Sequence, residues 1–127
     1  MHKSMKALLI VAHGSRREAS NEEVRRLAAL IDDETDEYDI VDCAFLELAQ
    51  PDIVTGGECL IRQGATEIVA MPYFLVAGRH VVTDVPEEIE RLREKHPDIP
   101  IRISPYLGAH DAMAELILRQ AAAKEPH

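Results

Sequence analysis

Four short segments that are expected to be strands, each followed by a segment with helical periodicity, constrain the fold of this chain more than any other feature. They span residues 6–12, 40–46, 66–71 and 99–104. The segment 6–12 is a continuous apolar run, which is typical of a parallel strand covered on both faces, whereas Pro100 near the start of the last segment fits an edge strand. Because β-α-β crossovers are right-handed, the alternation predicts an α/β three-layer sandwich, a four-stranded parallel sheet with helices on both faces. We expect the flavodoxin-like strand order 2-1-3-4, within a single domain over 1–127.

The segments between the runs carry the usual helix signals. Ser20 to Glu23 fits a capping box, Pro51 suits the first position of a helix, and Asp84 is expected to cap the next one. Gly64 is a good residue for the end of the second helix. We expect helices over about 20–33, 51–63, 84–95 and 109–124.

Two further patterns inside these helices bear on packing. Gly56-Gly57 lies within the second helix and costs it about 1 kcal/mol per glycine relative to alanine. We therefore expect that helix to pack closely against another element. In the fourth helix, one stripe carries Met113, Leu116, Ile117 and Gln120.

Composition excludes several classes of partner. A formal net charge of −9 argues against binding to nucleic acid or to an anionic membrane surface. No apolar run approaches the roughly 20 residues that a membrane span needs. The segment Met1 to Lys6 lacks the apolar region of a signal peptide, so we expect a cytoplasmic protein. Cys43 and Cys59 lack metal-ligand spacing and are expected to be buried free thiols.

Two histidines follow strands that the topology places side by side. His13 comes directly after the first strand, and His80 belongs to a long loop after the third. In open parallel sheets, ligands bind outside the carboxyl ends of the strands, where the strand order reverses. For the order 2-1-3-4 that point lies between strands one and three. The topology therefore predicts that His13 and His80 meet, within the distance at which they can share a metal ion.

Two neutral imidazoles at one edge suit a first-row divalent metal such as Co²⁺, Ni²⁺, Fe²⁺ or Zn²⁺. Two protein ligands are too few for a closed structural site, so they suit a metal that arrives, is held loosely and leaves. Glu47, at the end of the second strand, could add a carboxylate or act as a base. Each of these could also be an unrelated polar loop residue. His110 lies near the same edge, where it either joins the site or caps the last helix.

The same edge gathers small and basic residues that suit a ligand rich in carboxylates. Glycines allow the backbone to approach a ligand closely, and nearby helix N-termini add N–H donors. Solvated loop arginines are the alternative interpretation. No Walker A or G-x-G-x-x-G pattern supports nucleotide binding. The residues are Gly14, Ser15, Arg16, Arg17, Gly78 and Arg79.

Four segments, taken together, resemble the CbiX/SirB family of class II chelatases. They are Ala12–Arg16, Phe45–Pro51, Pro72–Pro86 and Leu107–His110, and the match runs in register over nearly the whole chain. The stretch 71–86 is the most specific part.

The resemblance implies insertion of a divalent metal, Co²⁺ in the first place and Ni²⁺ or Fe²⁺ as alternatives, into sirohydrochlorin. This substrate is a tetrapyrrole with eight carboxylates, and no other cofactor is required. The metal-handling histidines of the family correspond to His13 and His80, and its acidic residue to Glu47. Arg16 and Arg79 would grip peripheral carboxylates. Short members of the family pair as homodimers, so that two domains enclose one cleft.

Two other functions stay open on the sequence alone. One is a metal-binding carrier on the same fold, which would deliver metal without inserting it. The other is a flavodoxin-like module for a phosphate-bearing cofactor, although the chain has no tryptophan to flank a flavin ring. Imidazole accepts cobalt, nickel and iron, so the sequence does not select among them. It also leaves open whether Glu47 or a histidine accepts the protons.

Overall fold

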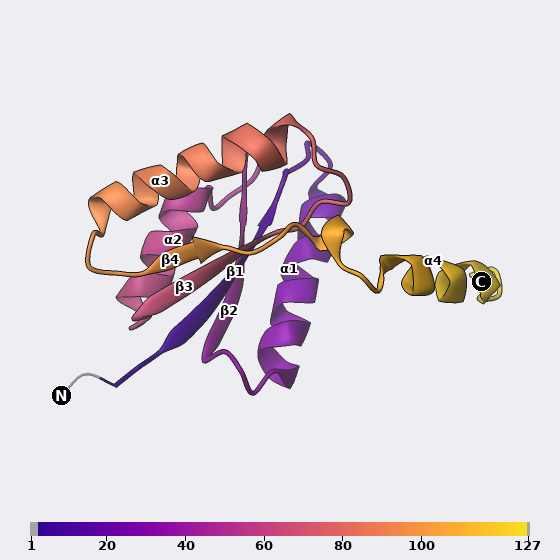
Figure 1. Cartoon of the computed structure of the whole chain (residues 1–127), viewed down its shortest axis with the longest axis horizontal. Coiled ribbons are helices and arrows are strands. Elements are labelled where there is room, and N and C mark those ends of the chain that lie inside the picture. The colour runs from indigo at the N-terminus through magenta and orange to yellow at the C-terminus, as the bar shows by residue number, and fades with distance from the viewer. Residues whose placement is uncertain (1–2, 127) are drawn as a thin grey trace.

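The computed structural model of the chain describes residues 3–126 and confirms the predicted architecture (Figure 1). Its four strands run parallel in the order β2-β1-β3-β4. Residues 1–2 and 127, which the single-domain expectation includes, lie outside the described part. The strands are β1 (Lys6–Ala12), β2 (Ile40–Phe45), β3 (Glu67–Pro72) and β4 (Ile101–Ile103).

Helices cover both faces of this sheet. The helix α1 (Glu18–Glu34) packs on one face, and α2 (Ile53–Arg62) and α3 (Val85–Lys95) pack on the other. Because β1 pairs with both β2 and β3, its side chains are covered from both sides, as a continuous apolar run predicts. Leu9 and Ile10 point to opposite faces and are both fully buried.

The start of α1 differs from the prediction. The helix begins at Glu18, so Ser20 lies inside it and the predicted capping box does not form. Asn21 is only 2% exposed and turns toward the loop before the helix. Its side-chain oxygen accepts from Ser15 N at 2.9 Å, and its amide donates to Ser15 O at 2.8 Å. The polar residue that was interpreted as part of a cap instead holds the loop after β1.

Close packing of α2 is confirmed at both glycines. A Cβ at Gly56 would lie 2.9 Å from the Ala44 Cβ on β2, and one at Gly57 would collide with the side chain of Leu92 on α3. Helix α2 begins after Asp52, whose side chain accepts from Thr55 N at 2.8 Å. The prediction that Pro51 opens the helix was therefore two residues early.

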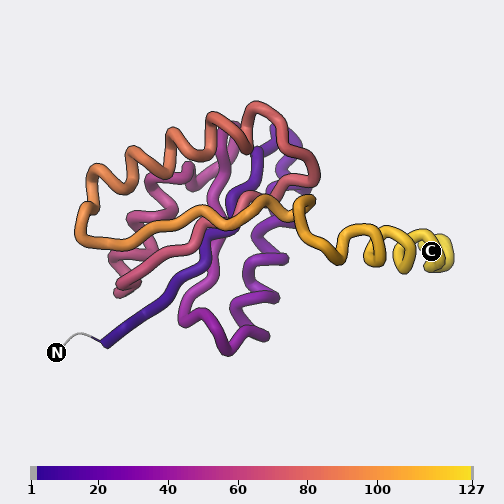
Figure 2. The backbone as a smooth tube through the Cα atoms, in the orientation of Figure 1, coloured from indigo at the N-terminus to yellow at the C-terminus, as the bar shows by residue number. Residues whose placement is uncertain are grey.

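The carboxyl-terminal part of the chain departs most from expectation. Strand β4 has three residues instead of the six expected over 99–104, and it lies at the edge of the sheet. A single 3₁₀ turn, Leu107–Ala109, follows, and α4 (Met113–Ala122) begins only after it. None of the residues of α4 is buried, and the helix runs away from the sheet (Figure 2). Helical periodicity located the apolar stripe, but it does not tell which surface covers it.

The structure also tests the expectations about the two cysteines and about membrane-spanning segments. Cys43 and Cys59 are both free thiols; Cys43 is buried, whereas Cys59 is half-buried. Burial raises the pKa of the Cys43 thiol to about 11, which makes it a poor nucleophile at neutral pH. Within residues 3–126, no helix has both the length and the apolar character that a membrane crossing demands.

We predict that Gly57→Ala destabilises the fold, although alanine favours a helix by about 1 kcal/mol. The new methyl group would push into Leu92, which is fully buried and cannot yield easily. Overpacking of a core typically costs about 1–3 kcal/mol, so we expect a net loss in urea unfolding. Gly78→Ala is the matched control, because a Cβ there meets no atom within 4 Å. A Gly57→Ala midpoint at or above the wild-type value would contradict this account of the packing.

Candidate functional site

The structure brings His13 and His80 together at the carboxyl edge of the sheet. His13 directly follows β1, and His80 begins a five-residue π-helical turn, His80–Asp84, between β3 and α3. Their ring centroids are 4.4 Å apart, with the ring planes tilted by 51°. Because β1 pairs with β3, the two histidines lie close together, as the topology predicted.

Backbone contacts between the ends of β1 and β2 fix Glu47 beside His13. Glu47 N donates to His13 O at 3.0 Å, and Leu46 N donates to Ala12 O at 2.9 Å. Gly14 has a φ of 95°, and a Cβ at this position would collide with the carbonyl of Glu47. Only glycine fits here, so Gly14 has a clear role in the close approach of the two loops.

Hydrogen bonds at Nδ1 orient both imidazoles in the same way. The Nδ1 of His13 lies 3.0 Å from Gly14 O, and the Nδ1 of His80 lies 2.8 Å from the Oδ2 of Asp84. Both partners are acceptors, so they place the proton of each neutral ring on Nδ1. The lone pair of each ring is then on Nε2, which is the form of histidine that binds a metal ion.

The sequence predicted that Asp84 caps α3, and the structure shows that this prediction is wrong. Its own backbone is helical, with φ −69° and ψ −45°, and its side chain makes no capping bond. A helical turn continues back from α3 to His80, which puts residues 80 and 84 on one face. The long loop after β3 is thus partly helical, and the spacing of four between a histidine and an aspartate was the signal for this pair.

Glu47 adds a carboxylate to the pair. Its Oε2 lies 3.5 Å from the Nε2 of His13, and the side chains of His13 and Glu47 are 40% and 50% exposed. With the His13 proton on Nδ1, two acceptors face each other here, an arrangement that a cation would stabilise. No three His, Cys, Asp or Glu side chains converge on one metal-sized point within residues 3–126. The protein ligands alone would therefore leave most of a metal's coordination positions open.

The other predicted residues lie in the same loops as the histidines, and two of them are in contact, since Arg17 N donates to the Oγ of Ser15 at 3.0 Å. Arg16 and Arg79 are exposed, and within the described residues their side chains form no hydrogen bond or ion pair. Gly78 is also exposed, with open space where a Cβ would be. Ser15 is held through its backbone by Asn21. The roles of these residues in substrate binding stay predictions. Their position beside the histidines is consistent with those roles.

His110 has a local structural role. Its Nδ1 accepts a hydrogen bond from Ala112 N at 2.9 Å, just before α4 begins. This is the capping alternative that the sequence left open.

Sequence reasoning missed an apolar rim next to the histidines. Leu75, Val76 and Val82 are 65%, 74% and 67% exposed, and all three belong to the segment that carries His80. The ring of Phe74 also stacks near that of His80, with centroids 6.4 Å apart. An apolar rim beside polar, metal-binding groups suits a ligand that is flat and apolar at its centre and charged at its periphery.

The fold and this centre together define an α/β protein with a pair of histidines at the switch point of its parallel sheet. The sequence model of the CbiX family matches residues 7–124, and the chain belongs to that family.

Relatives within this family differ in length and in the metal named for them. The chain is 34% identical over 110 residues to a chloroplastic sirohydrochlorin ferrochelatase of Arabidopsis thaliana, covering 87% of this chain and 48% of that protein. It is 29% identical over 122 residues to a sirohydrochlorin cobaltochelatase of Methanococcoides burtonii, covering 90% and 92%. The chain thus spans about half the length of the Arabidopsis relative, but nearly all of the second.

A solved structure shares the fold. The sirohydrochlorin chelatase SirB from Bacillus subtilis subspecies spizizenii, in complex with cobalt, superposes with a TM-score of 0.83 at 30% sequence identity. The match covers 92% of this chain and 50% of that one.

We predict that Asp84→Ala weakens the binding of Co²⁺ by about 10- to 100-fold, as is typical when a carboxylate partner of a metal-binding histidine is removed. Without Asp84, the proton of His80 is free to move to Nε2, and the ring is free to turn. Isothermal titration of the protein with Co²⁺ measures the affinity. The matched control is Glu87→Ala, which removes an exposed carboxylate near the start of α3. Equal affinities for the two variants would rule out this role of Asp84.

Proposed function

We propose that this chain inserts a divalent metal ion, Co²⁺ in the first place, into sirohydrochlorin. The observation that carries the proposal is the pair of imidazoles 4.4 Å apart, each with its Nδ1 bonded to an acceptor and its Nε2 left to bind a metal. Membership in the CbiX family supports it, as do relatives named as sirohydrochlorin ferrochelatases and cobaltochelatases.

Insertion exchanges one M²⁺ ion for two pyrrole N–H protons. His13 and His80 hold the metal through Nε2 on one face of the ring while it loses water. As the metal approaches the macrocycle, the N–H groups become more acidic, and a nearby base can accept their protons. Glu47 is placed for this step, since its Oε2 is 3.5 Å from the Nε2 of His13. The products are the metallated ring and two protons.

A site with few protein ligands suits this reaction better than a closed one. The metal must leave the histidines for the four nitrogens of the macrocycle, so tight coordination by the protein would slow the transfer. No third His, Cys, Asp or Glu completes the site within the described residues. The open positions are available to water on arrival and to pyrrole nitrogens on departure.

The substrate is held by its carboxylates and by its ring. Arg16 and Arg79 are exposed at the same edge and offer charge-assisted hydrogen bonds to carboxylates. Leu75, Val76 and Val82 offer an apolar surface to the macrocycle. Gly78 keeps the backbone between these groups free of a side chain, so that the substrate can approach it.

The proposal also concerns which metal ion the protein inserts. Imidazole nitrogen binds Co²⁺, Ni²⁺ and Fe²⁺, and affinity alone does not select among them. The relatives described above include both a ferrochelatase and a cobaltochelatase. We place Co²⁺ first because the cobaltochelatase is the one that this chain covers almost completely.

We further propose that residues 1–127 form one chelatase domain, working in the cytoplasm as a homodimer. The centre lies on an open edge, with the side chains of His13 and His80 40% and 43% exposed. One such edge supplies a single wall for a tetrapyrrole. A second copy facing it would supply the other wall.

The first experiment measures insertion and binding for His80→Ala. Loss of a metal ligand or proton acceptor should lower kcat for Co²⁺ insertion by about 10²-fold or more, followed by the absorption spectrum of the macrocycle. Affinity for metal-free sirohydrochlorin should stay nearly unchanged, because no carboxylate contact is lost. A protein that binds Co²⁺ but never changes the spectrum would instead be a metal carrier.

The matched variant is Arg79→Ala, one residue away and more exposed. It removes a charge-assisted hydrogen bond worth about 1.5–3 kcal/mol, so substrate affinity should fall roughly 10- to 150-fold. The turnover rate at saturation should change much less. Both variants should barely move the melting temperature, since neither side chain is buried. If His80→Ala unfolds the protein, or if both variants affect only binding, the assigned roles are wrong.

A further inference from the structure

Helix α1 carries the only polar side chain that is buried within residues 3–126. Asn21 is 2% exposed, and it continues the stripe that Val24, Ala28 and Ile31 form against the sheet. A polar side chain in such a position lowers stability unless hydrogen bonds satisfy it. An apolar residue would pack there without that requirement, so the amide must have another role.

The hydrogen bonds of Asn21 are directed at the loop after β1. Its Oδ1 accepts from Ser15 N at 2.9 Å, and its Nδ2 donates to Ser15 O at 2.8 Å. The second proton of Nδ2 goes to the Oε2 of Glu18 at 3.3 Å. Asn21 therefore fixes both backbone groups of Ser15, two residues after His13.

Arg25 lies one turn further along the same face of α1 and contacts the loop after β2. Its Nη2 donates to Gln50 O at 3.0 Å, and its guanidinium lies 5.2 Å from the centre of the Phe45 ring at the end of β2. The loop between Phe45 and Gln50 carries Glu47. One face of α1 thus holds both loops that supply the proposed site.

Glu18 connects the two contacts. One of its carboxylate oxygens accepts from Asn21, and the other pairs with the Nη1 of Arg25. The hydrogen bond from Arg25 lowers the pKa of Glu18. Because Glu18 is largely exposed, this ion pair contributes little to stability, and its main effect is to orient its two partners. We call Glu18, Asn21 and Arg25 the α1 network.

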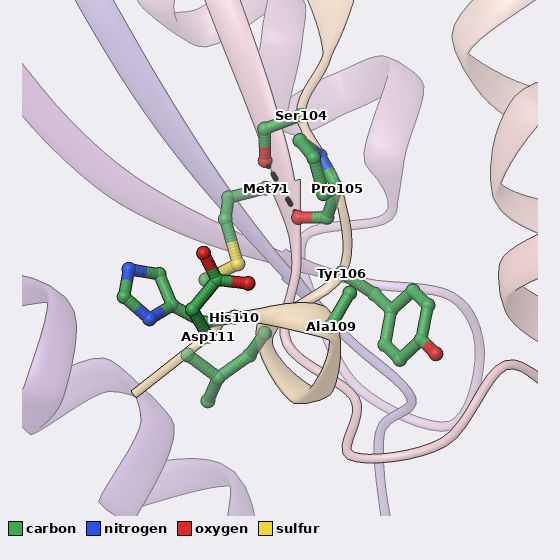
Figure 3. A pocket seen from close by; sticks show the side chains of 8 residues that line it. Met71, Ser104, Pro105, Tyr106, Ala109, His110 and Asp111 are labelled. Carbon is green, nitrogen blue, oxygen red and sulfur yellow. Dashed lines mark hydrogen bonds between the residues drawn. The ribbon is translucent and has the colours of Figure 1, made fainter. Parts of the chain in front are cut away.

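The other side of the centre has no comparable network. A cavity of about 440 Å³ lies beyond the ends of β3 and β4, and Met71, Ser104 and Tyr106 are among the residues that line it (Figure 3). In the strand order β2-β1-β3-β4, this cavity is on the side away from β2 and Glu47. The position of Glu47 therefore depends on its contacts with the loop after β1 and with α1.

We propose that Asn21 and Arg25 are positioning residues for proton transfer, because together they hold Glu47 at its distance from His13. Asn21 holds the loop after β1 and Arg25 the loop after β2, while Glu47 N donates to His13 O between them at 3.0 Å. These contacts set the 3.5 Å between the Oε2 of Glu47 and the Nε2 of His13.

This inference rests on the proposed function, in which Glu47 accepts a proton from the macrocycle. The pyrrole N–H bond breaks as the O–H bond of Glu47 forms, and the electron pair stays on the nitrogen that binds the metal. Neither Asn21 nor Arg25 touches the metal or the ring. A misplacement of about 1 Å in the reacting groups can lower a rate by about 100-fold, so residues that only hold the loops can control this step.

Amide hydrogen exchange of the full chain, without metal or macrocycle, tests the positioning itself. Arg25→Ala should speed exchange about 10-fold at Leu46 and Glu47, whose N–H groups bond to the loop after β1, and should leave Ile10 in β1 unchanged. Arg26→Ala is the matched control, since this neighbouring side chain is exposed and forms no hydrogen bond or ion pair within the described residues. Unchanged exchange at Glu47 in the Arg25→Ala chain would overturn the proposal.

Asn21→Leu should have the same effect on exchange at Glu47. Leucine continues the apolar stripe and has a similar size, but it makes none of the hydrogen bonds of the amide. We therefore expect a folded chain with a melting temperature close to that of the wild type. A folded Asn21→Leu chain with normal exchange at Glu47 would contradict the role of Asn21. Should this variant fail to fold, Arg25→Ala, which changes a partly exposed side chain, still decides the proposal.

A double-mutant cycle tests whether Arg25 acts through Glu47. Arg25→Ala should lower kcat for Co²⁺ insertion about 10-fold and leave KM for sirohydrochlorin nearly unchanged. In a Glu47→Gln chain, the same change should lower kcat less than about twofold, because the group that Arg25 positions is already absent. Equal losses in both backgrounds would overturn the proposal. If the wild type inserts no metal, the proposed function fails, and hydrogen exchange still shows whether the α1 network holds Glu47.

Discussion

The parallel pairing of β1 with β3 is the constraint on which the rest of the site depends. Val11 pairs with Pro72, and Tyr73 N extends the ladder by donating to Val11 O at 2.7 Å. The chain segments that follow these two strands must therefore leave the sheet side by side. One begins with His13 and the other leads into the turn that carries His80, so two residues 67 positions apart in sequence form one centre. Neither loop needs to be long or rigid for this, because the sheet supplies the alignment.

The sequence was sufficient to predict the strand order and the meeting of the histidines, because continuous apolar runs and right-handed crossovers leave few topologies. It failed where a side chain had two possible partners. Asp84 has the composition of a helix cap, but a helical turn continuing back to His80 gave it a histidine to bind instead. Asn21 was likewise assigned to a cap, and the structure uses it to hold Ser15. Periodicity located the apolar stripe of α4, but it gave no sign that the structure would leave every residue of this helix unburied.

The acidic character of the chain does not conflict with an anionic substrate. The formal net charge is −9, yet the carboxyl edge carries Arg16 and Arg79, whose side chains form no ion pair within residues 3–126. At physiological ionic strength, charges interact over about 8 Å, so distant carboxylates on the helices are screened from the site. The substrate contacts proposed for these two arginines are therefore compatible with the negative net charge. Nucleic acid, which requires an extended basic surface, is disfavoured by the same argument.

The histidine pair and α4 are both incomplete in a single chain. Within the described residues, the histidines would leave coordination positions open on a metal ion, and α4 leaves its apolar side exposed. A closed metal site would hold the ion too tightly to release it to a macrocycle, and a helix seated on its own sheet would leave the edge with a single wall. Exposed apolar surface makes a helix less stable in water. At a metal-transfer site, by contrast, open coordination positions would lower the barrier to release of the metal ion. The two features are compatible only if the surface that covers the helix leaves the histidines accessible.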